Sequence, residues 1–467
     1  MNKSSSFSQT KTTESMKFRE SRLALLFDES TKLDLNLSIM KEKQNMMNNI
    51  IKKNEHMRAQ SVKNFDQIRE EKKKTEDQMK NIRIKSKLKK LDRTKLLRDV
   101  ALKLIMCPYG EFTEIVCHWS RLHIEGWIPE SREGCTLSLY NNRLYLIGGL
   151  SRNIMNQVLE LPLSNPKWKA YANFSFKLEP IFAHTTVTYE SILLIFGGTI
   201  DYNELTRKRE CLNIIRSLSP STGQMNYLAT HGAIYEFRKY HTSVIYCNHM
   251  MVYGGMNPKN SILDSCIVLN LTKLKWRNLN TTGPNPGPLA GHASCAVFFP
   301  EVSKSLFKKP KSIKNLKFQG VYIFGGCGID NKPNNKVYVL IPGRRPLTWV
   351  MPFIVGQIPT PRYYHSMVWV EKINSLVVYG GRNDMEGVSY ADVHVLRLEQ
   401  LSWIRVVITG NPPCSRSSHC AVASEKKMYV FGGVSYGKYC PSELLVMDFD
   451  FPELYKKKNT LMLPKVM

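Results

Sequence analysis

The chain has 467 residues, of which 43% are hydrophobic and 22% are charged, so most of it can bury a sizeable core. Its 66 Lys and Arg residues exceed its 39 Asp and Glu residues, and the formal charge of +27 favours acidic partners such as nucleic acid, an anionic membrane or an acidic protein surface. The 7 Trp, 19 Phe and 21 Tyr residues exclude a wholly disordered protein, and no apolar run approaches the roughly 20 residues of a membrane-spanning helix.

The N-terminus lacks the apolar stretch of a secretory signal, and the 11 cysteines are scattered without a CxxC pair. We therefore expect reduced thiols and a cytoplasmic protein.

The first 106 residues differ sharply in composition from the rest. All 27 Gly, 23 Pro, 11 Cys, 7 Trp and 21 Tyr residues lie at or beyond Cys107. Residues 1–36 begin with a Ser- and Thr-rich stretch and are expected to be disordered, whereas residues 37–106 are rich in good helix formers and predict a helical arm. Heptad spacing is only partial, because Lys72 and Thr75 occupy positions that a dimeric coiled coil would fill with apolar residues. A coiled coil therefore remains an alternative to a single charged helix.

The arm is strongly basic. Residues 1–105 hold 26 Lys and Arg against 14 Asp and Glu, a higher density of positive charge than in the rest of the chain. Residues 80–90 are expected to be either a solvated helix face or a contact for an acidic polymer or surface. Their six basic residues, with no acidic one between them, are Lys80, Arg83, Lys85, Lys87, Lys89 and Lys90.

Beyond the arm, six short apolar runs each end in a glycine doublet. Each run reads as a buried strand, followed by backbone that needs positive φ or a close approach. The doublets are 49, 57, 71, 55 and 52 residues apart, and a Lys-rich insertion at roughly residues 301–319 explains the longest spacing. The doublets occupy positions 148–149, 197–198, 254–255, 325–326, 380–381 and 432–433.

Other residues recur in phase with the doublets. A His opens a strand in five units, an Arg precedes that strand in four, and a Trp ends most units, with Tyr227 expected to replace it in the second unit. In the first unit, Gly134 and Cys135 stand where other units have a His. The recurring residues are His184, His241, His292, His365 and His419; Arg132, Arg238, Arg362 and Arg416; and Trp168, Trp276, Trp349 and Trp403.

This ordered set resembles the kelch repeat over residues 111–450. The resemblance implies an all-β, six-bladed kelch-type β-propeller, preceded by the long α-helical, partly disordered arm and followed by a basic tail at residues 451–467. The sixth unit lacks a Trp-bearing fourth strand, and residues 114–119 (EIVCHW) contain a candidate for it. We therefore predict that this N-terminal strand completes the last blade and closes the ring.

The sequence gives little support for catalysis. Each recurring His occupies the same place in a different unit, which favours internal hydrogen bonding over metal binding, and the glycine doublets open no phosphate-binding helix. Cys107, Cys117 and His118 lack the second close pair of a zinc site. We predict no catalytic residues, no metal and no cofactor.

A binding role follows from the resemblance, because a rigid propeller positions loops for recognition. The loops after the glycine doublets should lie on one face and offer Arg and Tyr, which suit an acidic peptide or tail. Ordinary solvated loops are the alternative. The candidate partner-binding residues are Arg152, Tyr202, Arg207, Arg209, Lys259, Arg382, Tyr390, Tyr436 and Lys438.

The sequence therefore predicts a non-enzymatic adaptor, in which the propeller binds an acidic protein partner and the basic arm anchors it to an acidic assembly, for which microtubules or ciliary axonemes are the preferred hypothesis. Ribonucleoprotein association through the arm is an alternative, although the arm has few aromatic residues for base stacking. A kelch-type substrate receptor of a ubiquitin ligase and a carbohydrate-active propeller enzyme are further alternatives.

Overall fold

The structure is a computed structural model that describes residues 115–171, 178–203, 208–233, 235–298, 319–343, 346–404 and 406–449. The predicted N-terminal disorder, the helical arm with its basic residues, nearly all of the Lys-rich insertion and the basic tail lie outside this part of the chain. Within it, no helix is long and apolar enough to cross a membrane.

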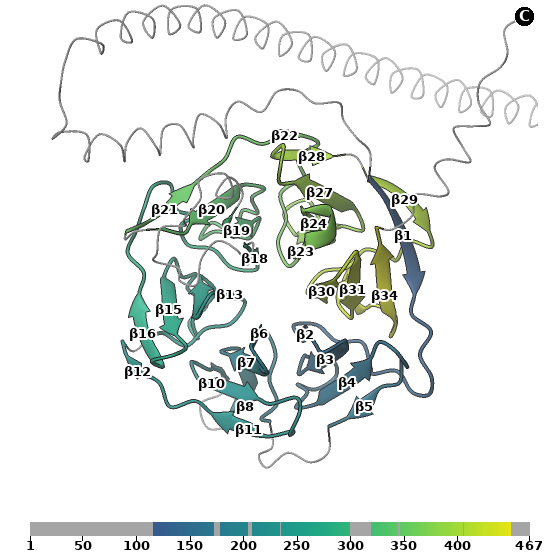
Figure 1. Ribbon diagram of the computed structural model, residues 1–467, viewed down its shortest axis with the longest axis horizontal. Helices are drawn as coiled ribbons and strands as arrows, with labels where there is room; N and C mark the ends of the chain where they lie inside the picture. The colour runs from purple at the N-terminus through teal and green to yellow at the C-terminus, as the bar shows by residue number, and fades with distance from the viewer. Residues whose placement is uncertain are drawn as a thin grey trace, which may run out of the picture. The chain divides into compact units, whose positions relative to one another are not determined.

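The described strands form six blades arranged in a ring (Figure 1), which confirms the predicted six-bladed all-β propeller. The first strand of each blade lies nearest the axis, and each later strand pairs antiparallel on its outer side. Blade 1 contains β2 (Thr136–Tyr140), β3 (Arg143–Ile147), β4 (Val158–Pro162) and β5 (Lys169–Ala170). Blade 2 contains β6 (Thr185–Tyr189), β7 (Ile192–Phe196), β10 (Ile215–Leu218) and β11 (Met225–Tyr227). Blade 3 contains β13 (Thr242–Tyr246), β14 (His249–Tyr253), β15 (Cys266–Asn270) and β16 (Lys275–Asn278).

The second half of the ring repeats this plan. Blade 4 contains β18 (Ala293–Val297), β19 (Gly320–Phe324), β20 (Val337–Ile341) and β21 (Leu347–Val350). Blade 5 contains β23 (Ser366–Val370), the 3₁₀ turn η1 (Glu371–Ile373), β24 (Ser375–Tyr379), β27 (Val393–Arg397) and β28 (Ser402–Ile404). Blade 6 contains β30 (Cys420–Ser424), β31 (Lys427–Phe431), β34 (Leu444–Asp448) and β1 (Ile115–Arg121).

The last blade is completed by the N-terminal strand, as predicted. β1 pairs antiparallel with β34, placing Trp119 opposite Met447, and Figure 1 shows β1 beside the C-terminal strands. Trp119 is buried and lies 4.9 Å from the Tyr379 ring of blade 5, measured between ring centroids. One blade thus combines strands from both ends of the propeller, and these noncovalent contacts close the ring.

Four blades carry an additional outer strand, which pairs parallel with the fourth strand. A glycine in each outer strand, or directly after it in blade 4, lies against the carbonyl group of the Trp in the fourth strand, where a Cβ atom would overlap the carbonyl oxygen. The outer strands cover backbone edges that would otherwise be open to pairing. They are β12 (His231–Gly232), β17 (Thr281–Thr282), β22 (Val355–Gly356) and β29 (Val406–Gly410) in blades 3 to 6; the glycines are Gly232, Gly283, Gly356 and Gly410.

The hydrophobic core is divided among the six interfaces between neighbouring blades. At the seam between blades 6 and 1, for example, Trp168 packs against Phe431 with ring centroids 6.1 Å apart. Burial of apolar surface stabilises each interface by roughly 25 cal/mol per Å². Stability is therefore distributed around the ring rather than concentrated in one centre.

The prediction that Tyr227 replaces the missing Trp of the second unit is wrong. Met225, which is buried, pairs with Leu218 at the place where the other blades hold their Trp. Tyr227 lies two residues further along β11 and is exposed, beneath the guanidinium of Arg216. An unbranched Met can fill the apolar space that an indole ring fills in the other blades. The search for a second aromatic residue therefore selected Tyr227 instead of Met225.

Candidate protein-interaction face

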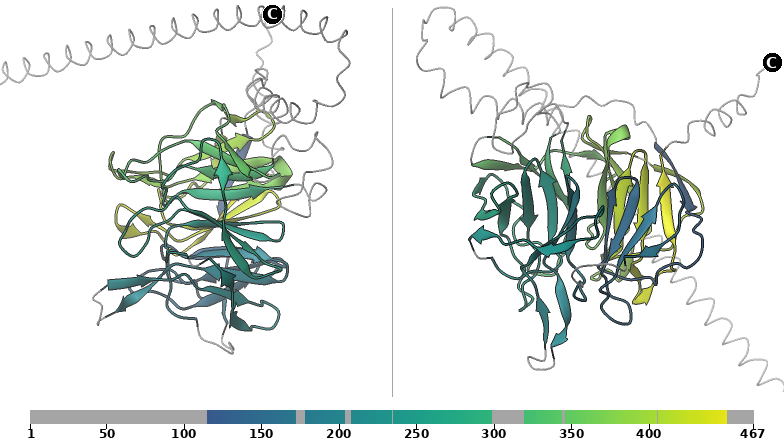
Figure 2. Two further views of the ribbon diagram at one scale, coloured as in Figure 1. Left: turned by 90° about the vertical axis from the view of Figure 1, so that its left-hand side faces the viewer. Right: turned by 60° about the horizontal axis from the view of Figure 1, so that its bottom comes forward.

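The loops between the second and third strands of all blades lie on one face, called here the loop face. In every blade, the residue after the glycine doublet forms a β-bridge with the segment that leads into the first strand. Three of these loops form hairpins, and the left view of Figure 2 shows them extending to the same side. The hairpins are β8 (Thr199–Asn203) with β9 (Lys208–Cys211), β25 (Arg382–Asn383) with β26 (Val388–Ser389), and β32 (Val434–Ser435) with β33 (Lys438–Tyr439).

A closed ring of backbone hydrogen bonds surrounds the axis on this face and is called here the mouth ring. One residue per blade takes part, all with positive φ between 54° and 62°. The N–H of each residue donates to the carbonyl of its counterpart in the preceding blade over 2.7–3.1 Å, including the bond from Gly134 of blade 1 to Ser418 of blade 6. The six residues are Gly134, Ala183, Tyr240, Gly291, Tyr364 and Ser418.

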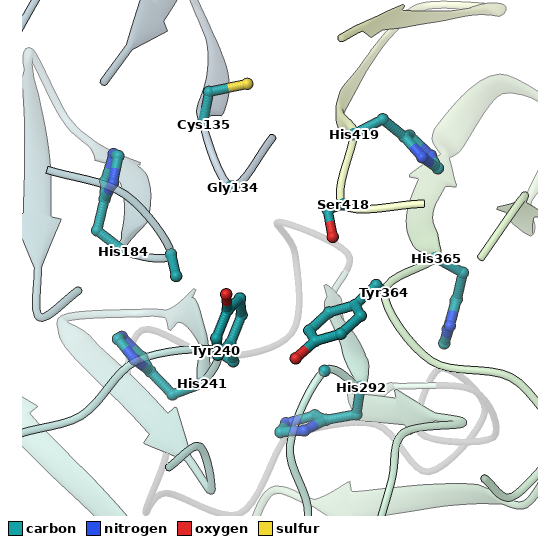
Figure 3. A pocket seen from close by; sticks show the side chains of 12 residues that line it. Gly134, Cys135, His184, Tyr240, His241, His292, Tyr364, His365, Ser418 and His419 are labelled. Carbon is teal, nitrogen blue, oxygen red and sulfur yellow. The ribbon is translucent and has the colours of Figure 1, made fainter. Parts of the chain in front are cut away.

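The mouth ring lines a cavity of about 130 Å³. Tyr240, Tyr364 and Ser418 direct their side chains into the opening (Figure 3), whereas blades 1, 2 and 4 contribute only Gly or Ala. A Cβ atom on Gly291 would come within 2.9 Å of the Tyr364 ring, so glycine is needed to make room for this tyrosine. The hydroxyl groups in the cavity therefore come from blades 3, 5 and 6.

Arg382 at the base of the β25–β26 hairpin links the loops to this cavity. Its guanidinium carbon lies 5.0 Å from the centroid of the Tyr364 ring and 5.5 Å from that of Tyr363, and its Nε lies 3.1 Å from Asp384 Oδ1. Tyr364 in turn packs against Tyr240 with centroids 5.0 Å apart. Burial raises the pKa of the Tyr364 hydroxyl above its ordinary value, so the phenol stays neutral. The result is a continuous arginine–tyrosine cluster at the channel mouth.

The five recurring histidines lie behind the mouth ring, and four of them form hydrogen bonds between blades. Nε2 of His184 bonds to Thr136 Oγ1 of the preceding blade at 3.1 Å, and the same contact recurs from His241 to Thr185, from His292 to Thr242 and from His419 to Ser366. Burial lowers the pKa of His184, His292 and His419 to about 3, and lowers those of His241 and His365 well below the ordinary value. All five are neutral near pH 7. The predicted structural role of these residues therefore fits their geometry.

The recurring arginines fix each blade to its own glycine doublet. Arg132, Arg238, Arg362 and Arg416 are almost completely buried, and each donates through Nη1 to the carbonyl of the first glycine of its doublet at 2.9–3.3 Å. Arg362 also forms two bonds to Asp392, at 2.6 and 2.8 Å. Although burial alone would raise the pKa of Asp392, the bonds from Arg362 and His394 hold it below its ordinary range.

Those residues proposed from sequence that the structure describes lie on loops of the loop face and do not form one patch. The side chains of Arg152, Lys259, Lys438 and Tyr436 are exposed, whereas Arg382 and Tyr390 are half-buried. Tyr390 lies beneath the buried Arg362, 4.2 Å from the guanidinium carbon to the ring centroid. Tyr202 and Arg209 face each other in the backbone register of the β8–β9 hairpin, and Arg207 lies outside the described residues.

Three consecutive loops have exposed apolar tips, of which the sequence analysis had identified only Tyr436. Ile329 of blade 4, Met385 of blade 5 and Tyr436 of blade 6 are 73%, 65% and 70% exposed. Loops 5 and 6 touch each other, because the Ser389 N–H donates to the Tyr436 hydroxyl at 3.4 Å. Exposed large apolar side chains on neighbouring loops are typical of a protein-binding surface. Ile329 and Met385 are single apolar residues inside polar loops, and such residues give no periodic signal that could have revealed them.

No group of three or more His, Cys, Asp or Glu side chains in the described part of the chain is arranged to hold a metal ion.

Comparison with known proteins gives a family match over residues 112–299 and 315–462, to the family described as the KLHDC2/KLHL20/DRC7 Kelch-repeats domain. Host cell factor 1 of Rattus norvegicus is 28% identical over 290 residues, which are 58% of this chain and 13% of that protein. Host cell factor homolog hcf-1 of Caenorhabditis elegans is 30% identical over 283 residues, 55% of this chain and 31% of the relative.

The Rab9 effector protein with kelch motifs of Homo sapiens is 27% identical over 190 residues, 41% of this chain and 45% of that protein. The chain thus spans less than half the length of each of these relatives. The family match covers more than half of the chain and coincides with the six blades. This chain belongs to the kelch-repeat family.

Proposed function

We propose that this protein is a non-enzymatic scaffold that binds a protein partner through the loop face. The observation that carries the proposal is the run of exposed tips at Ile329, Met385 and Tyr436, which borders the arginine–tyrosine cluster around Arg382. Aromatic, Met and Arg side chains are enriched in the central part of protein interfaces. One relative is named Rab9 effector protein with kelch motifs, a name that describes a protein acting with another protein.

An acidic segment of the partner suits the polar part of this surface. Arg382 is one-third exposed and remains accessible beside Asp384, and Lys438 and Arg152 lie on exposed loops of blades 6 and 1. A carboxylate approaching the mouth would find a guanidinium held against two tyrosine rings, which restricts its motion and lowers the entropic cost of binding.

We further propose that the basic residues of the arm attach the scaffold to an acidic cytoplasmic assembly, with microtubules or ciliary axonemes as the preferred candidate. The support is the charge of residues 80–90, because six positive charges without an acidic neighbour favour salt-sensitive contact with an acidic lattice.

The loop-face proposal is tested by affinity purification of the full chain from a nuclease-treated extract, comparing wild type with Arg382→Glu and with the double variant Met385→Ala and Tyr436→Ala. The matched control is Lys372→Glu, an exposed residue of the same blade in the turn on the opposite face. We expect a defined set of proteins that both loop-face changes reduce at least tenfold and that the control leaves unchanged. Equal capture by all variants would refute the loop face as the binding site.

The arm proposal is tested separately by co-pelleting the full chain with microtubules at low and high salt. Changing the six basic residues of the 80–90 run to Gln should abolish pelleting, whereas the control change of three tail residues should not. The control residues are Lys456, Lys457 and Lys458. This part of the proposal would be contradicted if the protein did not bind microtubules at low salt, or if binding survived the six changes. Binding that disappears with nuclease would indicate nucleic acid instead.

A further inference from the structure

The interface between the first and last blades, called here the seam, lacks the histidine–hydroxyl hydrogen bond found at most other blade interfaces. At four interfaces, a His bonds to the hydroxyl of the residue that opens the first strand of the preceding blade. At the fifth, Ala293 offers no hydroxyl to His365. At the seam, Cys135 replaces the His and Cys420 replaces the Thr or Ser, so two thiols meet where the repeat elsewhere has an imidazole and a hydroxyl.

The two sulfur atoms are within reach of each other. The Sγ atoms of Cys135 and Cys420 lie 3.2 Å apart, although 285 residues separate them in the chain. Both residues are only 6% exposed. Because a disulfide bond is about 2.05 Å long, a shift of roughly an ångström brings the two sulfurs to bonding distance.

One of the two cysteines lines the cavity at the channel mouth. Cys135 borders this cavity of about 130 Å³ together with Tyr240, Tyr364 and Ser418, and its sulfur is turned away from the opening (Figure 3). A molecule the size of hydrogen peroxide that enters the cavity therefore comes next to the residue that carries the thiol. Burial raises the pKa of the Cys420 thiol well above its ordinary value, which keeps Cys420 protonated and leaves the first attack on peroxide to Cys135.

We propose that Cys135 and Cys420 are a redox modification site, at which a small peroxide converts the two thiols into a disulfide that joins the first blade to the last. Cys135 gives up its thiol proton and its sulfur attacks one peroxide oxygen, the O–O bond breaks, the departing hydroxide takes that proton to leave as water, and a sulfenic acid forms on Cys135. The Cys420 sulfur then attacks the Cys135 sulfur, the S–O bond breaks, and the departing hydroxide takes the thiol proton to leave as water. In total the two thiols lose two electrons and two protons, and one peroxide becomes two waters.

The bond would add a covalent link to a ring that is otherwise closed by noncovalent contacts. Beside it, the Gly433 N–H donates to the Arg132 carbonyl and the Gly134 N–H to the Ser418 carbonyl, each at 2.9 Å. A crosslink over a loop of this length reduces the conformational freedom of the unfolded chain strongly. Oxidation should therefore hold the mouth ring closed and raise the melting temperature.

A second pair of cysteines in blade 6, Cys414 and Cys440, is a competing site of oxidation. Cys414 is exposed, and its Sγ lies 3.7 Å from Nη2 of Arg416. Burial raises the pKa of Cys440 to about 12, although the nearby Arg416 charge lowers it. Peroxide that enters from solvent meets Cys414 directly, so the experiment has to distinguish the two pairs by peptide.

The test treats the full-length reduced protein with increasing hydrogen peroxide, blocks the remaining thiols, and maps tryptic peptides without reduction. Trypsin releases the two proposed partners as residues 133–143 and 417–426, each with a single cysteine, and separates them from the peptides that hold Cys414 and Cys440. We expect the crosslinked pair 133–143 with 417–426 to become the main form of these peptides, to lose two hydrogens in mass, and to be reversed by dithiothreitol.

Variants connect the crosslink to stability. Peroxide should raise the melting temperature of wild type and of the control Cys266→Ser, but not that of Cys420→Ser. The double variant Cys135→His with Cys420→Thr restores the pairing found at other interfaces, so it should fold and show no oxidative shift even where the serine variant folds poorly. The inference is overturned if peroxide crosslinks only Cys414 to Cys440, if no 133–143 to 417–426 crosslink forms when Cys414 is already oxidised, or if the double variant shifts as wild type does.

Discussion

Acidification should destabilise the propeller far above the pH at which carboxylates titrate, because five histidines are buried in their neutral form. Each is held between two blades, where a positive charge would lose its hydration without gaining an acidic partner. Between pH 6.5 and about 3, the native state therefore binds fewer protons than the unfolded chain. The stability that these residues contribute is fully present above pH 6.5 and is lost progressively as the pH falls towards 3.

The pKa of about 3 for His184, His292 and His419, against 6.5 when unfolded, sets the magnitude. At pH 5, keeping one such side chain neutral costs about 2 kcal/mol, and at pH 7 about 0.2 kcal/mol. The three together should remove roughly 6 kcal/mol of unfolding free energy between pH 7 and pH 5, which is comparable with the whole stability of many domains.

The measurement is denaturant unfolding at pH 7 and pH 5, followed by the fluorescence of the buried tryptophans. His292→Gln removes one titrating ring and keeps a polar group near Thr242, so its loss of stability on acidification should be about 2 kcal/mol smaller than that of wild type. His231→Gln is the control, because His231 is exposed and should leave the loss unchanged. A wild-type stability that stays within about 1 kcal/mol between the two pH values would refute the argument, as would an equal loss in wild type and His292→Gln.

Three further substitutions test how the ring is held together. Trp119→Ala removes a buried indole from the N-terminal strand that closes the ring, and should lower the unfolding free energy by about 4 kcal/mol in denaturant unfolding; a loss below 1 kcal/mol would mean that this strand is dispensable. Gly432→Ala should lower the melting temperature more than Gly437→Ala does. Both glycines have positive φ, but only a Cβ atom at position 432 would overlap a carbonyl oxygen of blade 1. Equal melting temperatures of the two variants would contradict this. Arg362→Lys keeps the charge but loses the bidentate contact with Asp392, and should lower the unfolding free energy by about 2 kcal/mol. An unchanged melting temperature would show that the bidentate contact is not needed for stability.

Part of the candidate site could be predicted because it repeats. The loops after the glycine doublets and the positions of Arg382 and Tyr436 follow from the repeat, since each doublet ends a buried strand at the same edge of its blade. The cluster of Arg382 with Tyr364 could not be predicted, because these residues come from a loop and from the entry to a first strand, and only the blade brings them together. Exposure of Ile329 and Met385 likewise depends on how neighbouring loops pack.

The sequence by itself determined the number of blades, the strands and the residues that recur in them. Buried strands need apolar runs, and the turn after each strand needs glycine, so both leave local marks that repeat. Only the tertiary structure decided which residues meet across the ring: Met225 at the place of a tryptophan, the mouth ring, and Cys135 beside Cys420. These contacts join residues up to 285 positions apart. The packing of neighbouring blades brings such distant residues into contact, and local composition does not encode which side chains meet there.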